Sequence, residues 1–383
     1  MSTHDEPRRG RPRRYIALFA LVALSALLVA ACGDDDDDGG DGTTAASAAS
    51  GDAPEWCGDE AVTLGIQDGG GLNDWSKQSF EQVQAAVDDC PNIEDTIVVN
   101  AGFDPQKAVS GLQGMIAQNA NAIVIIPDAG VCAELPTIRQ ATQRGIVVVP
   151  WAADSCGEEG TDFETYVDFD NVEAGRQFAR FVGEQMGGKG NLLYLGGPAG
   201  NPVDAGEIKG MYEILDAEYP DITVLDDVTE ENWPVTNWDP AEAAKVSAAL
   251  IAKYPQIDGM ISSYGSVAGA AVKELQKAGR PIPPIATLEQ NELACIYEDA
   301  KGTPDEFQLA TVSNRNWLGQ VAVRKAVAAV NGIEDTGNSI VVLPFSENST
   351  DPELQPVCDP AAPAETFHSN EKADQQIAEL VDG

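Results

Sequence analysis

The sequence has 383 residues, and its 23 Lys and Arg stand against 62 Asp and Glu, a formal net charge of −39. That charge repels phosphate backbones, so it argues against nucleic-acid binding. The two histidines, His4 and His368, lie near the ends, which leaves no central imidazole for a Ser-His triad or a His-rich zinc site. A hydrophobic fraction of 43% can build packed cores, and the length allows two domains plus a leader.

Residues 1–31 have the layout of an export signal. A basic segment precedes an unbroken apolar run at 15–31, which ends in Ala30-Ala31 directly before Cys32. This order is typical of a secretory signal, and the run is short for a membrane span. Cysteine after the small pair resembles the lipobox of bacterial lipoproteins, so we expect cleavage before Cys32 and lipidation of its side chain. The alternatives are an ordinary signal peptide with a chance cysteine, or an uncleaved anchor.

The segment 32–58 is expected to be a flexible acidic tether. Between Gly33 and Ala53 it consists of Gly, Asp, Ser, Thr and Ala without periodicity, so it cannot bury apolar area. The run Asp34–Asp38 is interpreted as a solvated charge block, because a calcium site needs ligands spaced around a turn. We therefore expect an exported protein that is lipid-anchored to the outer face of the bacterial cell membrane.

Six cysteines remain after Cys32, an even number that indicates three disulfides in an exported chain. Six cysteines allow fifteen pairings, so the connectivity stays open. Proximity in the sequence suggests Cys57–Cys90, Cys132–Cys156 and Cys295–Cys358. Metal ligation is the rival interpretation, but no CxxC spacing occurs. We expect neither a metal nor a cofactor.

Short β-branched runs alternate with helix-length amphipathic segments from residue 61 onward. The expected strands are 62–66, 96–100, 122–126, 146–151, 191–195, 222–225, 259–262, 284–287 and 309–312. The expected helices are 76–87, 105–118, 134–144, 172–186, 204–218, 240–253, 266–278 and 317–330. Strands that are apolar throughout and joined by helices predict parallel sheets covered on both faces. The fold class is therefore α/β. The nine strands could form one large sheet, but the sequence favours two doubly wound parallel-sheet (Rossmann-like) lobes.

The predicted boundaries follow from two apparent crossings, at 167–171 and 314–317. Asp170-Asn171 is interpreted as hinge and helix cap. We expect an N-terminal lobe at 59–170 and a C-terminal lobe at 171–314. The chain then returns to the first lobe at 315–338, and a crossover and tail follow at 339–383. The tail holds a strand-like stretch at 340–343 and Cys358, and we expect it to cross back over the lobes.

An ordered set of segments resembles a known family. It comprises DGGGLNDW at 68–75, GFDPQ at 102–106, AIVIIP at 122–127, RGIVVV at 144–149, VDFDNVEAG at 167–175, GGKG at 187–190 and KAGRP at 277–281. Over residues 60–335 the chain is similar to type I periplasmic binding proteins, close to the ribose- and galactose-binding group of ABC importers. The resemblance implies two lobes joined by a three-crossover hinge, which close on a ligand between them.

The resemblance also implies ligand contacts, in loops at the carboxyl ends of strands. Several positions depart from the ribose-type pattern. The loop with Asp154 lies where that pattern has an Asp-Arg pair, and Glu207 lies where it has Arg. Tyr264, Glu289 and Asn314 replace its Asn, Asp and Gln. The full set is Asp74, Trp75, Trp151, Asp154, Glu207, Trp233, Trp238, Tyr264, Glu289 and Asn314. Aromatic rings cover the C–H faces of a sugar, and carboxylates and amides hydrogen-bond its hydroxyls.

The expected function is that of an extracytoplasmic solute-binding lipoprotein that delivers a sugar or polyol to an ABC permease, acting as a monomer. The same carboxylates and aromatic rings also suit a cationic ligand, such as a quaternary amine or amino sugar. Presentation of the ligand to a sensor is a further alternative. An enzyme such as a glycosidase is disfavoured, because no activated nucleophile or metal motif is present.

Overall fold

The computed structural model describes residues 53–70, 73–130 and 132–383. The expected export signal, Cys32 and nearly all of the tether lie outside these residues. Within the described residues, no helix is both long and apolar enough to cross a membrane.

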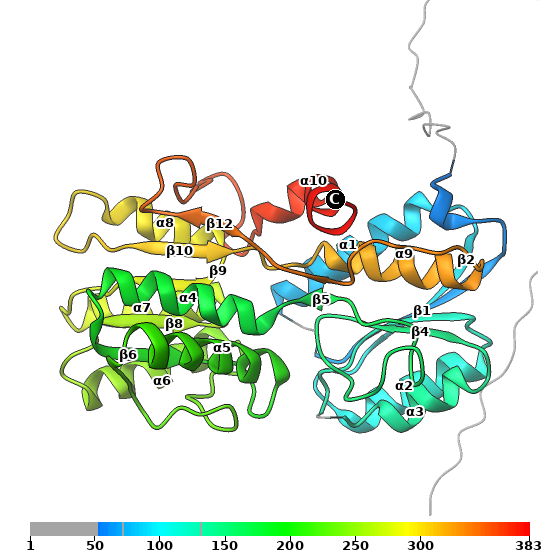
Figure 1. Cartoon of the computed structure of the whole chain (residues 1–383), viewed down its shortest axis with the longest axis horizontal. Helices are drawn as coiled ribbons and strands as arrows, with labels where there is room; N and C mark the ends of the chain where they lie inside the picture. Colours follow the sequence, from blue (N-terminus) through cyan, green and yellow to red (C-terminus); the bar gives the residue numbers. More distant parts are fainter. Residues whose placement is uncertain (1–52, 71–72, 131) are drawn as a thin grey trace, which may run out of the picture. The chain divides into compact units, whose positions relative to one another are not determined.

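The first lobe is built on a parallel sheet with the strand order β2-β1-β3-β4 (Figure 1). Its strands are β1 (Val62–Asp68), β2 (Ile93–Asn100), β3 (Ala122–Ile126) and β4 (Val147–Pro150). Its helices are α1 (Asp74–Asp89), α2 (Pro105–Ala117), α3 (Leu135–Thr142) and the much later α9 (Leu318–Val330), preceded by the short η1 (Glu55–Cys57). The sheet is covered on both sides, because α9 packs on α1, β3 and β4 while α2 and α3 pack on the sheet from the other face.

Strand β3 explains why a central parallel strand is apolar throughout. All five of its residues are buried. Ile123 and Ile125 pack into the cluster beneath α2 and α3, whereas Val124 belongs to the larger cluster that includes α9. Because successive side chains point to opposite faces, a strand covered on both faces has no position for a polar residue.

The second lobe has a six-stranded sheet with the order β12-β10-β9-β8-β6-β7. Its strands are β6 (Lys189–Leu195), β7 (Asp221–Val224), β8 (Gly259–Ser262), β9 (Ile285–Leu288), β10 (Leu309–Val312) and the antiparallel edge strand β12 (Phe345–Asn348). Its helices are α4 (Asn171–Gln185), α5 (Pro202–Glu218), α6 (Pro240–Lys253), α7 (Gly265–Lys277) and α8 (Asn291–Ala300). A Cβ atom on Gly175 would lie 1.9 Å from the Glu207 carbonyl oxygen, so glycine permits the close approach of α4 and α5.

The chain passes between the lobes three times, from β4 to α4, from β10 to α9, and from α9 to β12. The first and third passages pair with each other through the short parallel strands β5 (Asp168–Phe169) and β11 (Ile340–Val341). The Asp170 side chain accepts a hydrogen bond from the Glu173 N–H and so caps α4. The α/β class with two doubly wound lobes and a three-crossover hinge is confirmed.

The tail beyond β12 contacts both lobes. It contains η2 (His368–Lys372), α10 (Ala373–Gln376) and η3 (Ile377–Val381). Cys358 is bonded to Cys295 in α8, and Asp382 forms a 2.9 Å ion pair with Arg324 in α9. The expected disulfides Cys57–Cys90 and Cys132–Cys156 are present as well.

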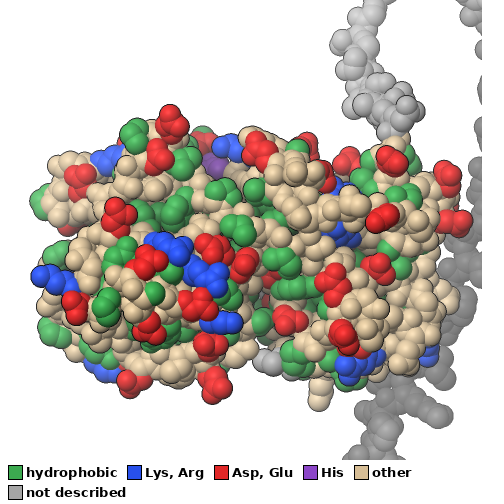
Figure 2. All heavy atoms as spheres, viewed as in Figure 1, with side chains coloured by type: hydrophobic (Ala, Val, Ile, Leu, Met, Phe, Trp, Pro, Cys, Tyr) green, Lys and Arg blue, Asp and Glu red, His purple; other side chains and the backbone are tan. Residues whose placement is uncertain are grey.

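Acidic side chains are spread over the face of the described residues that Figure 2 shows. Basic side chains gather over α4 and α5, where they are paired with carboxylates (Figure 2). Arg176 binds Glu173 at 2.9 Å and Glu213 at 2.7 Å, and Arg180 binds Glu218 at 3.2 Å. Arg176 and Arg180 are therefore neutralised by neighbouring carboxylates.

All nine expected parallel strands are present, and each expected helix overlaps a helix of the structure. The sequence analysis missed several elements, among them β12 and α8. Strand β12 has the polar sequence FSEN and lies at a sheet edge, so it lacks the apolar run that marks the buried strands.

Candidate ligand-binding cleft

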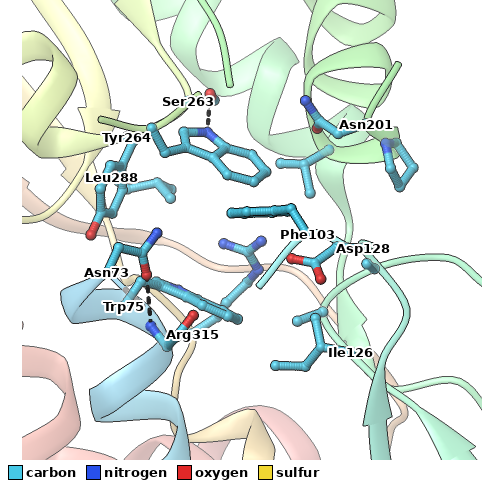
Figure 3. A pocket seen from close by; sticks show the side chains of 16 residues that line it. Asn73, Trp75, Phe103, Ile126, Asp128, Asn201, Ser263, Tyr264, Leu288 and Arg315 are labelled. Atoms are coloured by element: carbon cyan, nitrogen blue, oxygen red, sulfur yellow. Dashed lines mark hydrogen bonds between the residues drawn. The ribbon is translucent and has the colours of Figure 1, made fainter. Parts of the chain in front are cut away.

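A pocket lies between the two lobes, at the carboxyl ends of the strands (Figure 3). The first lobe lines it with the end of β3 and with the segments that follow β1 to β4. The second lobe lines it with the segments that follow β6, β7 and β8 and with the end of β9, and Arg315 comes from the passage after β10. Segments far apart in the sequence thus meet at one site. The lining residues are Asn73, Trp75, Ser76, Phe103, Ile126, Asp128, Ala152, Ala153, Asn201, Pro202, Val203, Trp238, Ser263, Tyr264, Leu288 and Arg315.

Two half-buried tryptophans come from opposite lobes. The Trp75 indole N–H donates a 2.9 Å hydrogen bond to the carbonyl oxygen of Asn314. The Trp238 indole N–H donates a 3.0 Å bond to the Ser263 hydroxyl, which is drawn as a dashed line at Ser263 in Figure 3. These bonds fix the orientation of both rings and occupy their only donors. What the rings offer to the pocket is therefore their apolar faces, which suit the C–H face of a sugar or polyol.

Phe103 adds a third ring from the loop between β2 and α2. Its side chain is 40% exposed, and Figure 3 shows its ring projecting into the pocket. Its φ of 59° is unusual for a bulky residue, and the next residue, Asp104, caps α2. An exposed aromatic ring held in this conformation at the pocket is suited to contact a ligand.

Arg315 is the pocket's cationic group. It is 5% exposed, and its Nε donates a 3.2 Å hydrogen bond to the Asp168 carboxylate. Its guanidinium carbon lies 4.5 Å from the centre of the Phe169 ring and 5.4 Å from that of Trp75. Within the described residues no further hydrogen bond occupies its two terminal amino groups, which Figure 3 shows directed into the pocket. These groups can bind hydroxyl oxygens.

Asp128, which follows β3, is the carboxyl group of the pocket lining. Its pKa is raised well above the usual value by burial and, secondarily, by the nearby Asp68 and Glu134. Burial also raises the pKa of Asp68, to about 6. A protonated Asp128 can both donate and accept a hydrogen bond, which matches a hydroxyl group.

Three of the expected contacts line this pocket: Trp75, Trp238 and Tyr264. Asp154 lies in an adjoining pocket that shares Asp128, Asn201 and Pro202 with the first, and its carboxylate accepts a 2.8 Å bond from the Cys156 N–H. Asp74 faces away from the pocket and forms a 2.9 Å ion pair with Lys77.

The other five expected residues are buried behind the lining. Trp151 packs against Trp75, with ring centres 5.9 Å apart, and the remaining four are fixed by hydrogen bonds. The indole N–H of Trp233 donates to the Gly197 carbonyl oxygen at 3.3 Å, and Glu207 accepts from the Tyr194 hydroxyl at 3.0 Å. Glu289 accepts from Ser369 and from the Asn314 N–H, while the Asn314 amide donates to the Glu289 carbonyl oxygen. These residues support the lining from behind.

Sequence reasoning missed Arg315, Phe103, Asp128 and Asn201. The last three follow β2, β3 and β6, so the strand-end rule that indicated Trp75 applies to them equally. Arg315 directly follows the expected Asn314. Its φ of 55° turns the chain, a conformation that the sequence does not reveal.

A family model described as a periplasmic binding protein domain matches residues 70–334, so the chain belongs to the periplasmic binding protein family. Membership of this family implies an exported, extracytoplasmic protein.

Among curated relatives, the xylitol-binding protein of Mycolicibacterium smegmatis is 32% identical over 193 residues, which cover 50% of this chain and 52% of that protein. The ribose import binding protein of Bacillus subtilis is 25% identical over 205 residues, covering 54% of this chain and 63% of that protein. The matches thus span about half to two thirds of the curated relatives' length.

Solved structures share the fold at low sequence identity. The binding protein of the arabinose ABC transporter from Shewanella sp. ANA-3 has a TM-score of 0.64 at 18% identity, and the match covers 82% of this chain and 97% of that one. A solute-binding protein from Bacillus halodurans C-125 with bound myo-inositol also has a TM-score of 0.64, at 16% identity, covering 75% and 95%.

Proposed function

We propose that the protein is an extracytoplasmic solute-binding protein of an ABC importer, and that it encloses a neutral sugar or polyol between its lobes. The observation that carries the proposal is the pocket itself. Trp75 and Trp238 enter it from opposite lobes, with Arg315 beside them. Enclosure requires the lobes to close about the three passages between them, a hinge motion that such folds support.

The lining favours a neutral ligand over a cation. The guanidinium of Arg315 lies in the pocket, where it would repel a quaternary amine. Glu207 and Glu289, which on sequence grounds could have attracted a cation, are buried outside it. Burial raises the pKa of Asp128, the carboxyl group that does line the pocket, and so lowers its negative charge. A polyhydroxylated neutral ligand satisfies the aromatic faces, the guanidinium and the protonated carboxyl group together.

The names of the curated relatives support a sugar or polyol as the ligand. The curated relatives are named for binding xylitol and importing ribose, which are a polyol and a sugar. We propose a monomer, anchored by lipid on Cys32, that delivers its ligand to an ABC permease and performs no catalysis. An ammonium ligand, or presentation to a sensor, has no specific support among the residues of the pocket.

Thermal unfolding with a ligand panel tests the proposal. The panel is xylitol, D-ribose, D-apiose, myo-inositol and choline. At 100 times its dissociation constant a ligand adds about 2.7 kcal/mol to the unfolding free energy, so a binder is easily detected. We expect stabilisation by at least one neutral member, loss of it in Trp238→Ala, and retention of it in Trp56→Ala, which truncates a half-buried tryptophan near α9. Stabilisation by choline alone, or by no member, would overturn the proposal.

A further inference from the structure

Asp168 in β5 contacts all three passages between the lobes. It lies in the first passage, and its N–H donates a 3.0 Å hydrogen bond to the Ser339 carbonyl oxygen in the third. Its carboxylate accepts the 3.2 Å bond from Arg315, which lies in the second. The side chain is 0% exposed, so it cannot reach a ligand itself.

We propose that Asp168 is a positioning residue, which holds the guanidinium of Arg315 at the pocket and thereby couples ligand contact to the angle of the hinge. The inference rests on the proposed function, because it requires a ligand in the pocket. It adds a coupling between two places, the pocket and the point where the three passages meet.

The Asp168 carboxylate is held from several sides. One oxygen accepts from Arg315 and, at 2.8 Å, from the Phe169 N–H. The other accepts from the Tyr166 hydroxyl at 2.5 Å and from the Asn171 amide at 3.3 Å. The pKa of Tyr166 is raised well above its usual value, first by burial and then by Asp168, so its hydroxyl remains a donor. A carboxylate with four donors has little freedom to turn.

Arg315 is fixed in turn by what surrounds it. Its guanidinium lies near the rings of Phe169 in the first passage and Trp75 in the first lobe, at 4.5 and 5.4 Å. Asp168 uses only its Nε, so the terminal amino groups remain for a ligand. The position of these groups therefore depends on both the hinge and the first lobe.

This dependence makes the coupling reciprocal. A change of hinge angle alters how the three passages meet, and so alters where Asp168 holds Arg315. A ligand that binds Arg315 stabilises the hinge angle at which Asp168 also holds Arg315. Conversely, the protein at that hinge angle binds the ligand more tightly, by the same factor. A merely structural ion pair would affect unfolding but not this equilibrium, and buried pairs often contribute little net stability.

The test uses Asp168→Asn, which keeps the size of the side chain and removes its charge. Spin labels at Gln106→Cys in α2 and Ala249→Cys in α6, both exposed, report the separation of the lobes. Xylitol, or D-ribose if xylitol does not stabilise the protein, is the probe. We expect about tenfold weaker affinity by calorimetry, within the usual range of coupled sites, and a smaller ligand-induced change in label distance.

Asp335→Asn is the matched control, because Asp335 forms a half-buried 2.7 Å pair with Arg324 away from the pocket. We expect this variant to lose stability but to keep the affinity and the label response. If Asp168→Asn does not fold, Tyr166→Phe loosens the same carboxylate more gently and should weaken affinity about threefold.

Unchanged affinity and label response in every folded variant of Asp168 or Tyr166, or equal losses in Asp335→Asn, would overturn the coupling. A wild-type protein that binds no sugar or polyol would instead overturn the proposed function, so the two failures are distinguishable.

Discussion

The two lobes hold their pocket loops by different means. In the first lobe, the disulfide Cys132–Cys156 joins the loops after β3 and β4, which carry Asp128 and Ala153 to the pocket. In the second lobe, the loop after β6 is held by buried hydrogen bonds instead. Asp204 accepts there from the Tyr194 hydroxyl at 2.7 Å and from the Gly197 N–H at 3.0 Å.

This difference shows that one site can be stabilised by a covalent link on one side and a polar network on the other. A disulfide acts mainly by restricting the unfolded chain, so its loss costs stability whatever the pocket contains. A buried network depends on every member, because each unpaired group carries its own desolvation cost.

The largest effect is expected from removing the centre of the network. Asp204→Ala leaves the Gly197 N–H buried without its acceptor and removes one of two acceptors from both Tyr194 and Asn201, so the unfolding free energy should fall by about 3 kcal/mol. Urea denaturation measures this change in the unfolding free energy. Asp239→Ala, at an exposed helix cap, should lose only about 1 kcal/mol. Equal losses in the two variants would contradict the network.

Removing the disulfide that joins the pocket loops of the first lobe tests the covalent side of the comparison. The double substitution Cys132→Ser/Cys156→Ser opens a link with a sequence separation of 24 and should lower the unfolding free energy by about 3 kcal/mol. It should also weaken xylitol binding, because the loops of Asp128 and Ala153 lose their connection. The matched control is Cys57→Ser/Cys90→Ser, with a separation of 33 and no part in the pocket lining. A similar loss of affinity in this control would refute a local role for Cys132–Cys156.

Behind the pocket wall of the second lobe, Glu289 should make stability depend on pH. Burial raises its pKa from 4.5 to about 7, so the folded protein binds this proton more tightly than the unfolded chain. The resulting stabilisation is present below about pH 4.5 and is lost as the pH rises through about 7. Each unit of raised pKa corresponds to about 1.4 kcal/mol.

Glu289→Gln should therefore reduce the fall in unfolding free energy between pH 4.5 and 7.5, measured by urea denaturation. In the first lobe, Asp68 has a pKa of about 6, so Asp68→Asn should remove a smaller dependence, in the window from about 4 to 6. An identical pH profile in wild type and Glu289→Gln would show that Glu289 does not hold its proton in this range.

The smallest effect is expected where one hydrogen bond orients a ring. Ser263→Ala removes the partner of the Trp238 indole and should weaken xylitol binding about two- to tenfold, the usual worth of one such bond. Tyr212→Phe removes the 2.7 Å bond from the Tyr212 hydroxyl to the Val228 carbonyl oxygen, outside the pocket, and should leave affinity unchanged. Equal affinities for Ser263→Ala and wild type would mean that packing alone orients Trp238.

The sequence predicts the fold better than the site. Parallel strands covered on both faces must be apolar throughout, so strands such as β3 are visible as runs. The sequence leaves the disulfide connectivity open, and the structure contains the three pairs that proximity in the sequence suggests. Side-chain direction after a strand depends instead on backbone angles. Arg315 lines the pocket while the neighbouring Asn314 is buried. Trp151 and Trp233 are also buried, although they follow strands just as the lining residues do, so a rule based on strand ends cannot tell the two groups apart.

Calorimetric titration of xylitol and choline into the wild-type protein, at low and high NaCl concentration, tests most directly whether the cleft binds a neutral polyol. We expect xylitol to bind with an affinity that hardly changes with salt, because no net charge is neutralised, and choline not to bind. Choline binding that weakens with salt, together with no heat from xylitol, would contradict the neutral ligand and with it the role assigned to Arg315.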